Sequence, residues 1–213
     1  MLKITEFCIL VFLGGEIMSY SLFVSVVYYV VACFYMFFGI HAMISNAKSS
    51  TNRLFMLLML SMSTWAFAYS FSTSLPATEL SAFIRSLSVF GWGFFYCFFL
   101  HFVLILINNR LQLNKPSRIF LFYLPALINI VLFSPFGYFA KMQYELVPHN
   151  FNWRTSLTVI NIGQVWITLY YITYSVSAFI LLIRWWKKIE PRSRLKRPVT
   201  FLLLSIIFSF LAG

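Results

Sequence analysis

Residues 184–198 read RWWKKIEPRSRLKRP, a basic segment between two long apolar runs. The segment holds seven of the chain's sixteen Lys and Arg residues and a single acid, Glu190. Trp185 and Trp186 stand at its leading edge, and tryptophan favours the headgroup layer of a bilayer, where its ring is apolar and its N–H can reach water. Cationic loops beside membrane spans gather on the cytoplasmic side. This segment therefore predicts the orientation of all the other spans.

The composition excludes a water-soluble fold. Apolar residues make up 61% of the 213 residues and charged residues 10%, against roughly 45–50% and about 25% in soluble proteins. A soluble domain of this length must still present a large surface to water, which so few polar residues would not cover. We therefore predict an all-α polytopic transmembrane helix bundle. The net charge of +11 then belongs to loops beside the anionic leaflet of the lipid bilayer, and no nucleic-acid partner is expected.

Six apolar stretches are candidates for crossing the hydrocarbon core as helices. They are residues 20–44, 54–71, 83–107, 119–136, 159–183 and 199–213. We expect the sixth to be incomplete and a seventh to be missing. Residues 1–19 are predicted to be an extracytoplasmic segment and residues 20–213 the bundle. A start of translation at Met18 is an alternative, because Gly14-Gly15-Glu16 can be encoded by codons that resemble a ribosome-binding site.

Lys and Arg are divided unequally between the two sets of connections. The connections after the first, third and fifth spans hold twelve of them, whereas the other side has Lys3, Arg85, Lys141 and Arg154. By the positive-inside rule, the N-terminus lies outside the cell and the protein is a multi-pass plasma-membrane protein.

Polar side chains recur along one side of the fifth span, at Asn161, Gln164, Thr168, Tyr171 and Ser175. Steps of three and four residues place them on one helix face. In lipid, such side chains turn toward the bundle or toward water. A hydrated or ligand-lined cavity and a line of helix packing both remain open for this face.

Small residues form similar stripes in two other spans, and here we favour close helix packing over a cavity. The first span has Ser25, Tyr28, Ala32, Tyr35, Gly39 and Ala42, and the sixth has Ser205, Ser209 and Gly213.

The third span contains two ionisable residues, Arg85 toward its outer end and His101 in its inner third. For Arg85 we favour snorkelling to the outer headgroups over holding an anionic ligand group. For His101 we favour a hydrogen bond between helices over a protonation-linked switch. The chain has no Asp and no His/Glu cluster. No metal, cofactor or catalytic residue is therefore predicted.

Aromatic residues gather at mid-membrane and in the outer half of the predicted bundle, where they can wall a site for a small or apolar ligand. The loop at 137–158, with Tyr144, is a candidate lid. The residues predicted to line the cavity are Trp65, Arg85, Trp92, His101, Asn161, Gln164 and Trp166.

Several short motifs in order suggest a family. They are Asn52-Arg53-x-Phe55, Trp65-Ala66, Arg85-x-Leu87, Gly91-Trp92, Leu100-His101-Phe102 and Leu124-Pro125-Ala126. In this order and spacing the chain, from about Tyr20 onward, resembles the seven-transmembrane N-terminal input region of bacterial sensor histidine kinases and related signalling proteins.

The resemblance implies a sensor that perceives a ligand or a membrane state and passes a helix movement to a cytoplasmic output domain, a kinase or a cyclic-dinucleotide synthase. Sensors of this sort commonly work as dimers, so a homodimer is a candidate form, although the sequence does not determine the oligomeric state. The chain by itself is not expected to be an enzyme. The alternative is a fragment of a small-molecule transporter or permease, although only Pro125 interrupts a span and no inverted repeat is evident. A lipid-modifying enzyme is a third class, but it lacks plausible catalytic groups.

Overall fold

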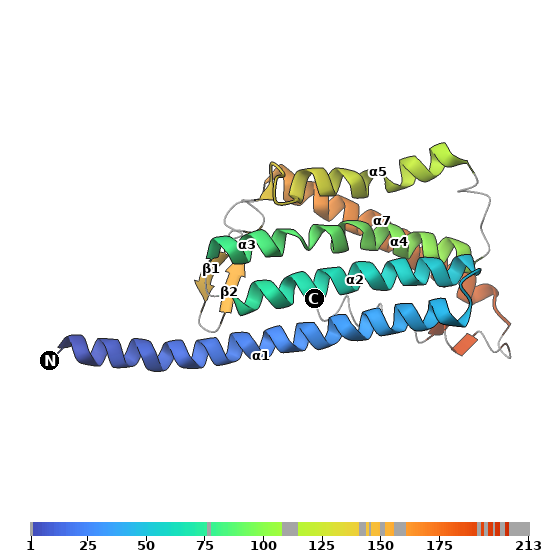
Figure 1. Ribbon diagram of the computed structural model, residues 1–213. Coiled ribbons are helices and arrows are strands. Elements are labelled where there is room, and N and C mark those ends of the chain that lie inside the picture. The colour runs from blue at the N-terminus through green and yellow to red at the C-terminus, as the bar shows by residue number, and fades with distance from the viewer. Residues whose placement is uncertain are drawn as a thin grey trace.

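The protein is a bundle of long helices with one short β-hairpin (Figure 1). The computed structural model describes residues 2–75, 78–107, 115–140, 144, 146–149, 152–155, 161–190, 193, 196–197, 199–200 and 203–204, and the side chains of 1–20, 78 and 146–155 are not among the described parts. The helices are α1 (Leu2–Ser45), α2 (Ser50–Ser74), α3 (Thr78–Ser86), α4 (Val89–Leu106), α5 (Pro116–Phe133) and α7 (Ile162–Lys188), and the strands are β1 (Leu146–His149) and β2 (Asn152–Thr155).

Within the described residues, five helices are long and apolar enough to cross a membrane. They correspond to the first five predicted spans, and α3 and α4 count together as the third, over 79–106. The sixth predicted span, 199–213, is described only at 199–200 and 203–204, which are helical. Its small-residue stripe at Ser205, Ser209 and Gly213 lies outside the described residues. Six spans and a missing seventh thus stay predictions.

Two features of the structure were not part of the predicted bundle: a β-hairpin, and an extension of the first helix toward the N-terminus. The strands β1 and β2 pair antiparallel inside the predicted outer loop, with Leu146 opposite Thr155 and His149 opposite Asn152. Helix α1 begins at Leu2, so it runs through the predicted N-terminal segment and projects beyond the rest of the bundle (Figure 1). A pattern of apolar residues cannot separate a span from a helix that continues past the membrane.

Local signals explain where the helices begin and end. Ser49 precedes α2 and its hydroxyl accepts from the backbone N–H of Asn52, and Asn161 caps α7 in the same way through the N–H of Gln164. Each cap satisfies a backbone donor that the first helical turn leaves unpaired. Pro116 occupies the first turn of α5, where its missing N–H costs nothing.

Helix α2 packs between α1 and α4. On the α1 side, hydroxyl and amide groups bond to backbone carbonyls: Ser21 to Thr73, Ser25 to Ser70 at 2.8 Å, Ser63 to Ala32 at 2.9 Å and Asn52 to Ala42 at 2.8 Å. Ser70 returns a bond to the carbonyl of Ser25 at 2.8 Å. Ser25, Ala32 and Gly39 are buried there, so the stripe of the first span is a line of close packing, as predicted.

Helix α4 lies at the centre of the remaining packing, because α2, α5 and α7 all contact it, whereas α5 and α7 touch each other little. Buried clusters follow α4 from one end to the other. The first contains Val89 and Trp92, the second Cys97, and the third Leu100, Val103 and Leu104.

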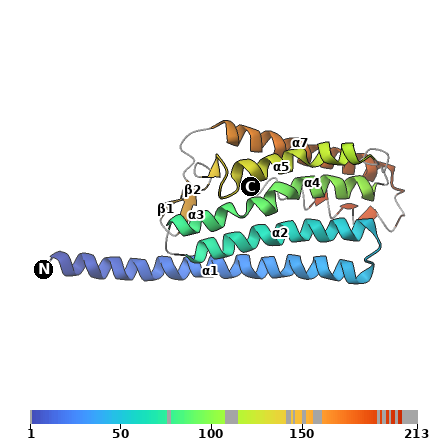
Figure 2. The same ribbon diagram turned by 45° about the horizontal axis from the view of Figure 1, so that its top comes forward.

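The two ends of the bundle differ in the charge of the residues beside them. At one end α1, α4 and α7 end and α2 and α5 begin (Figure 2), and we call it the basic end because Lys48, Arg53, Lys115, Arg118 and the described cations of 184–197 lie beside these helix ends. The opposite end, with β1, β2 and the first turns of α3 and α7, is called the hairpin end.

Gly91 and Gly93 on α4 provide a matched test of this packing. A Cβ added at Gly91 would meet the Ser61 carbonyl and lie 2.6 Å from the Trp65 nitrogen, whereas at Gly93 the nearest atom is 3.5 Å away. We expect Gly91→Ala to force α2 and α4 apart and to lower the free energy of unfolding by about 1–3 kcal/mol relative to Gly93→Ala. Thermal unfolding in detergent measures the difference. The two substitutions share the same gain in helix propensity, so equal stabilities would contradict the close α2–α4 contact.

Candidate functional site

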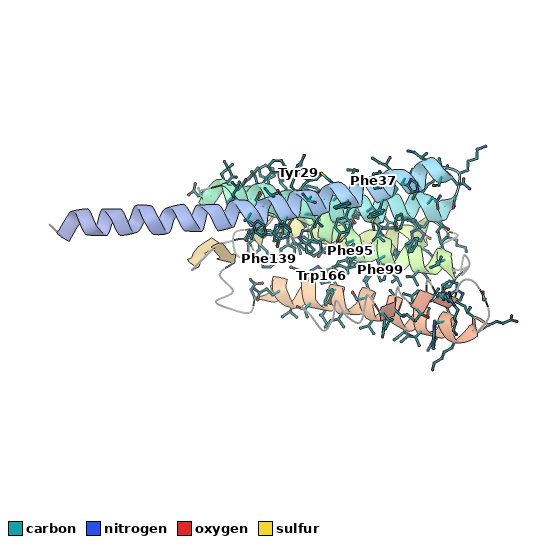
Figure 3. All side chains as sticks on the ribbon, turned by 90° about the horizontal axis from the view of Figure 1, so that it is seen from below. Tyr29, Phe37, Phe95, Phe99, Phe139 and Trp166 are labelled. Carbon is teal, nitrogen blue, oxygen red and sulfur yellow. The ribbon has the colours of Figure 1, made fainter. Side chains whose placement is uncertain are left out.

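A cluster of aromatic side chains fills the hairpin end of the bundle. Its buried members are Val89, Trp92, Phe133 and Tyr144, and half-buried side chains packed against them include Trp65, Phe139 and Trp166. Figure 3 shows Phe139 and Trp166 near the end at which α7 begins, with Phe95 and Phe99 further along the bundle. The three predicted cavity tryptophans, at 65, 92 and 166, are thus brought together from α2, α4 and α7. We call this group the tryptophan cluster.

Tyr144 connects the loop after α5 to the tryptophan cluster. The Trp92 Nε1–H donates to the Tyr144 hydroxyl at 3.1 Å, and Tyr144 is 4% exposed. Burial raises the pKa of this hydroxyl above its ordinary value, against the smaller opposing influences of Trp92 and Arg85. The Tyr144 hydroxyl therefore stays protonated at physiological pH.

Arg85 lies beside the tryptophan cluster and is buried, with only 6% of its surface exposed. Its Nε–H donates to the Ser72 hydroxyl at 3.1 Å, and its guanidinium carbon lies 4.9 Å from the centre of the Tyr69 ring. The prediction that Arg85 snorkels to the headgroups is therefore wrong. The side chain turns inward because Ser72 and Tyr69 on α2 offer an acceptor and a ring face.

The environment of Arg85 is polar but contains no carboxylate among the described side chains. The Ser81 hydroxyl donates to the Ser72 carbonyl at 2.6 Å, and the two hydroxyls lie 3.0 Å apart. Glu79 and Glu190 are the carboxylates whose side chains the structure describes, and both are exposed. A buried charge is normally paired. Arg85 thus places a positive charge next to aromatic walls, an arrangement suited to an anion or to a strong acceptor.

Asn129 is a buried polar residue that sequence reasoning missed. The Trp166 Nε1–H on α7 donates to the side-chain oxygen of Asn129 at 2.8 Å, and Asn129, which lies on α5, is fully buried. Its amide nitrogen has no hydrogen-bond partner. The signal was present, since an Asn inside an apolar span is costly unless it is bonded. It was overlooked because Asn129 stands alone and not in a stripe.

The first residues of α7 complete this end of the bundle. Asn161 serves as the helix cap, with its oxygen 2.8 Å from the Gln164 nitrogen, and the Gln164 side chain is half-buried. Gly163 between them packs against Phe139 of the tryptophan cluster. Along the rest of the predicted stripe Thr168 is exposed and Ser175 is buried. The stripe therefore borders the buried face of α7 and does not coincide with it.

His101 lies apart from the other predicted site residues. Its Nδ1 is 2.7 Å from the Tyr123 hydroxyl, so it forms a hydrogen bond between α4 and α5. This is the structural role that we favoured from the sequence. The ring also meets Phe122 edge to face.

Between His101 and the tryptophan cluster, buried hydroxyls bond to helix backbones. Tyr170 donates to the Gly93 carbonyl at 2.7 Å, and Tyr174 donates to the Phe122 carbonyl at 2.6 Å. Phe122 lies in the helical turn before Pro125. The Tyr174 hydroxyl thus finds within the protein the acceptor that a polar group inside a span needs.

At the basic end, Lys196 is bound to the end of α7. Its ammonium group donates to the carbonyls of Trp186 at 2.7 Å and Ile189 at 3.2 Å and lies 4.0 Å from the centre of the Trp186 ring. Trp186 Nε1–H in turn donates to Thr200 at 2.9 Å. A cation at the carboxyl end of a helix is favourable. The basic segment is therefore anchored to α7 by these residues, which we call the Lys196 clasp.

The buried cation, the aromatic walls and the polar start of α7 form an arrangement that is suited to binding. No set of three His, Cys, Asp or Glu side chains that could hold a metal ion occurs in the part of the chain that the structure describes. Of the seven predicted residues, the structure brings Trp65, Arg85, Trp92 and Trp166 to the hairpin end, with Asn161 and Gln164 at the nearby start of α7, and places His101 elsewhere.

The bond between Trp92 and Tyr144 can be measured by a double-mutant cycle. We expect Trp92→Phe and Tyr144→Phe together to cost less than the sum of the single changes, with a coupling of about 0.6 kcal/mol, typical of hydrogen bonds inside membrane proteins. Unfolding free energies from SDS titration in mixed micelles provide the four values. Strictly additive costs would show that the bond does not form.

No significant match was found among curated proteins or among solved structures. The model of the N-terminal 7TM region of histidine kinase matches residues 21–213, nearly the whole chain. That region is a non-catalytic, membrane-embedded sensory part of its kinases, in agreement with the apolar helices. The chain therefore belongs to the family of N-terminal 7TM regions of histidine kinases.

Proposed function

We propose that this chain is the signal-input module of a sensor kinase, which perceives a ligand at the hairpin end and relays a helix movement to a cytoplasmic kinase domain in the full-length protein. The observation that carries the proposal is the buried guanidinium of Arg85 beside the tryptophan cluster. A cation with no described carboxylate partner, set against aromatic walls, is an arrangement that suits recognition of a small, largely apolar ligand with an anionic or accepting group.

The basic end faces the cytoplasm and the hairpin end faces outward in this proposal. Support comes from the unequal distribution of Lys and Arg, since the cations of three connections gather at one end of the bundle. The N-terminus is then extracellular. A ligand from outside would reach the tryptophan cluster past the β-hairpin and Tyr144, the segment that we predict as a lid.

Helix α7 is the proposed path of the relay. It begins after its cap Asn161, beside the tryptophan cluster, and Gln164 lies in its first turn. It ends at Lys188, next to the Lys196 clasp, on the opposite side of the membrane. A ligand can bias the output only by its difference in affinity for two helix arrangements. In this proposal, contacts between the ligand and the start of α7 determine that difference in affinity, whereas His101 contributes to helix packing.

Orientation can be tested with single cysteines at the two ends. Tyr138→Cys and Lys48→Cys both replace exposed side chains, at the hairpin end and the basic end respectively. We expect a membrane-impermeant maleimide to label Tyr138→Cys in intact cells and Lys48→Cys only after permeabilisation, relative to the parent chain. The reverse pattern would show that the basic end is outside and would remove the inward relay.

The role of α7 can be tested in the full-length kinase with Gln164→Leu and a control on the same helix, Thr168→Leu, whose side chain is exposed. In the proposed site the Gln164 amide would form one hydrogen bond with the ligand, and the loss of about 0.6 kcal/mol would shift a two-state equilibrium about threefold. We expect a change of that size in autophosphorylation in nanodiscs for Gln164→Leu, and none for Thr168→Leu, with membrane insertion intact in both. If the two variants show the same activity, the start of α7 is not part of the sensing site.

A further inference from the structure

A groove runs along the surface of the bundle between α5 and α7, over α4, toward the basic end. It encloses about 470 Å³ and is lined by Leu100, Leu104, Arg118, Leu121, Phe122, Ser177 and Leu181. The volume lies within the usual range of ligand sites, about 300–1,000 Å³. The groove exists because α5 and α7 both pack against α4 but touch each other little.

The lining of the groove is amphiphilic along its length. Five of the seven lining residues are Leu or Phe, and the single charged one is Arg118, in the first turn of α5. Leu121 and Phe122 follow Arg118 on the same face of α5, one turn deeper into the membrane. The cation therefore lies at the end of the groove nearest the membrane surface, and the apolar part extends toward the midplane.

The surroundings of Arg118 add further positive potential. Lys115 precedes α5, and the first turn of α5 contains no acidic residue. The positive end of the helix dipole attracts anions, and the other cations of the basic end act in the same direction. The Ser177 hydroxyl on α7 is the other polar side chain that lines the groove.

We propose that this groove is a binding site for an anionic phospholipid of the leaflet at the basic end, with one acyl chain in the groove and the phosphate at Arg118. The lipid would bridge α5 and α7, whose direct contacts are few and consist mainly of side-chain bonds such as that of Tyr174 to the Phe122 carbonyl. This site is separate from the tryptophan cluster and does not depend on the proposed sensing of a ligand there.

The test is lipid binding by the delipidated full chain in detergent, followed by native mass spectrometry. The probes are dioleoylphosphatidylglycerol, which is anionic, and dioleoylphosphatidylcholine, which has no net charge. We expect the first bound phosphatidylglycerol to be about fivefold tighter than phosphatidylcholine, the effect of one cation near a membrane surface.

Two pairs of variants locate the site. Arg118→Gln is expected to reduce the preference for phosphatidylglycerol to nearly none, whereas Arg184→Gln, an exposed cation at the same end that does not line the groove, should leave most of it. Leu121→Trp fills the groove from a position that is 62% exposed, so the fold should tolerate it, and it should weaken binding of both lipids. Val176→Trp, 44% exposed on α7 outside the groove, should not.

Each outcome decides the proposal. Equal effects of Arg118→Gln and Arg184→Gln would show only a diffuse attraction to the basic end and would overturn a headgroup site. Unchanged binding by Leu121→Trp would show that the groove is not occupied by lipid. If Leu121→Trp instead altered the monomer–dimer equilibrium without altering lipid binding, the groove would be an interface between copies of the chain and the lipid proposal would be wrong. None of these results bears on signalling through Gln164.

Discussion

Hydrocarbon offers no hydrogen-bond partner, and this constraint governs most of the contacts in the bundle. A polar side chain inside a span is stabilised by a partner within the protein, either on its own helix, as for Ser61, or on a neighbouring helix. The serines between α1 and α2 bond to backbone carbonyls, Tyr174 bonds to the carbonyl of Phe122 near Pro125, and Trp166 bonds to Asn129. The polar groups therefore act as connectors that hold α2, α4, α5 and α7 in register, while Gly39 and Gly91 let the backbones approach.

The same constraint determines how much of this molecule the sequence could predict. The five described spans were predicted because their apolar length is a property of each segment alone. The packing stripe of the first span was predicted for a similar reason, since Ser25, Ala32 and Gly39 recur at helical spacing. His101 was assigned its hydrogen bond because an imidazole in a span has few alternatives. Its partner, Tyr123, was not predictable, since twenty-two residues and a loop separate the two.

Arg85 shows where sequence reasoning failed. A cation near the end of a span can either extend to the headgroups or turn inward, and its own segment does not decide between them. The direction of the Arg85 side chain depends on Ser72 and Tyr69, which belong to the preceding helix α2. These residues become neighbours of Arg85 only when the segment of α3 and α4 packs against α2, with its closest approach at Gly91. Periodicity within one helix contains no information about that crossing. The β-hairpin was missed for a different reason, because four-residue strands in a polar loop leave too short a pattern to detect.

The division of contacts around α4 suits the proposed relay. On one side, α1, α2 and α4 are joined by close backbone approaches at Gly39 and Gly91, which leave little room for sliding. On the other side, a single hydroxyl bond of Tyr170 joins α7 to α4, and a single hydroxyl bond of Tyr174 joins α7 to α5, beside contacts between aromatic rings. A hydrogen bond of this kind contributes only about 0.6 kcal/mol in a membrane protein. A ligand whose affinities for two arrangements of α7 differ only modestly would therefore shift α7 from one arrangement to the other without disturbing α1 and α2. The Lys196 clasp, at the far end of the same helix, is the place where such a movement would leave the membrane.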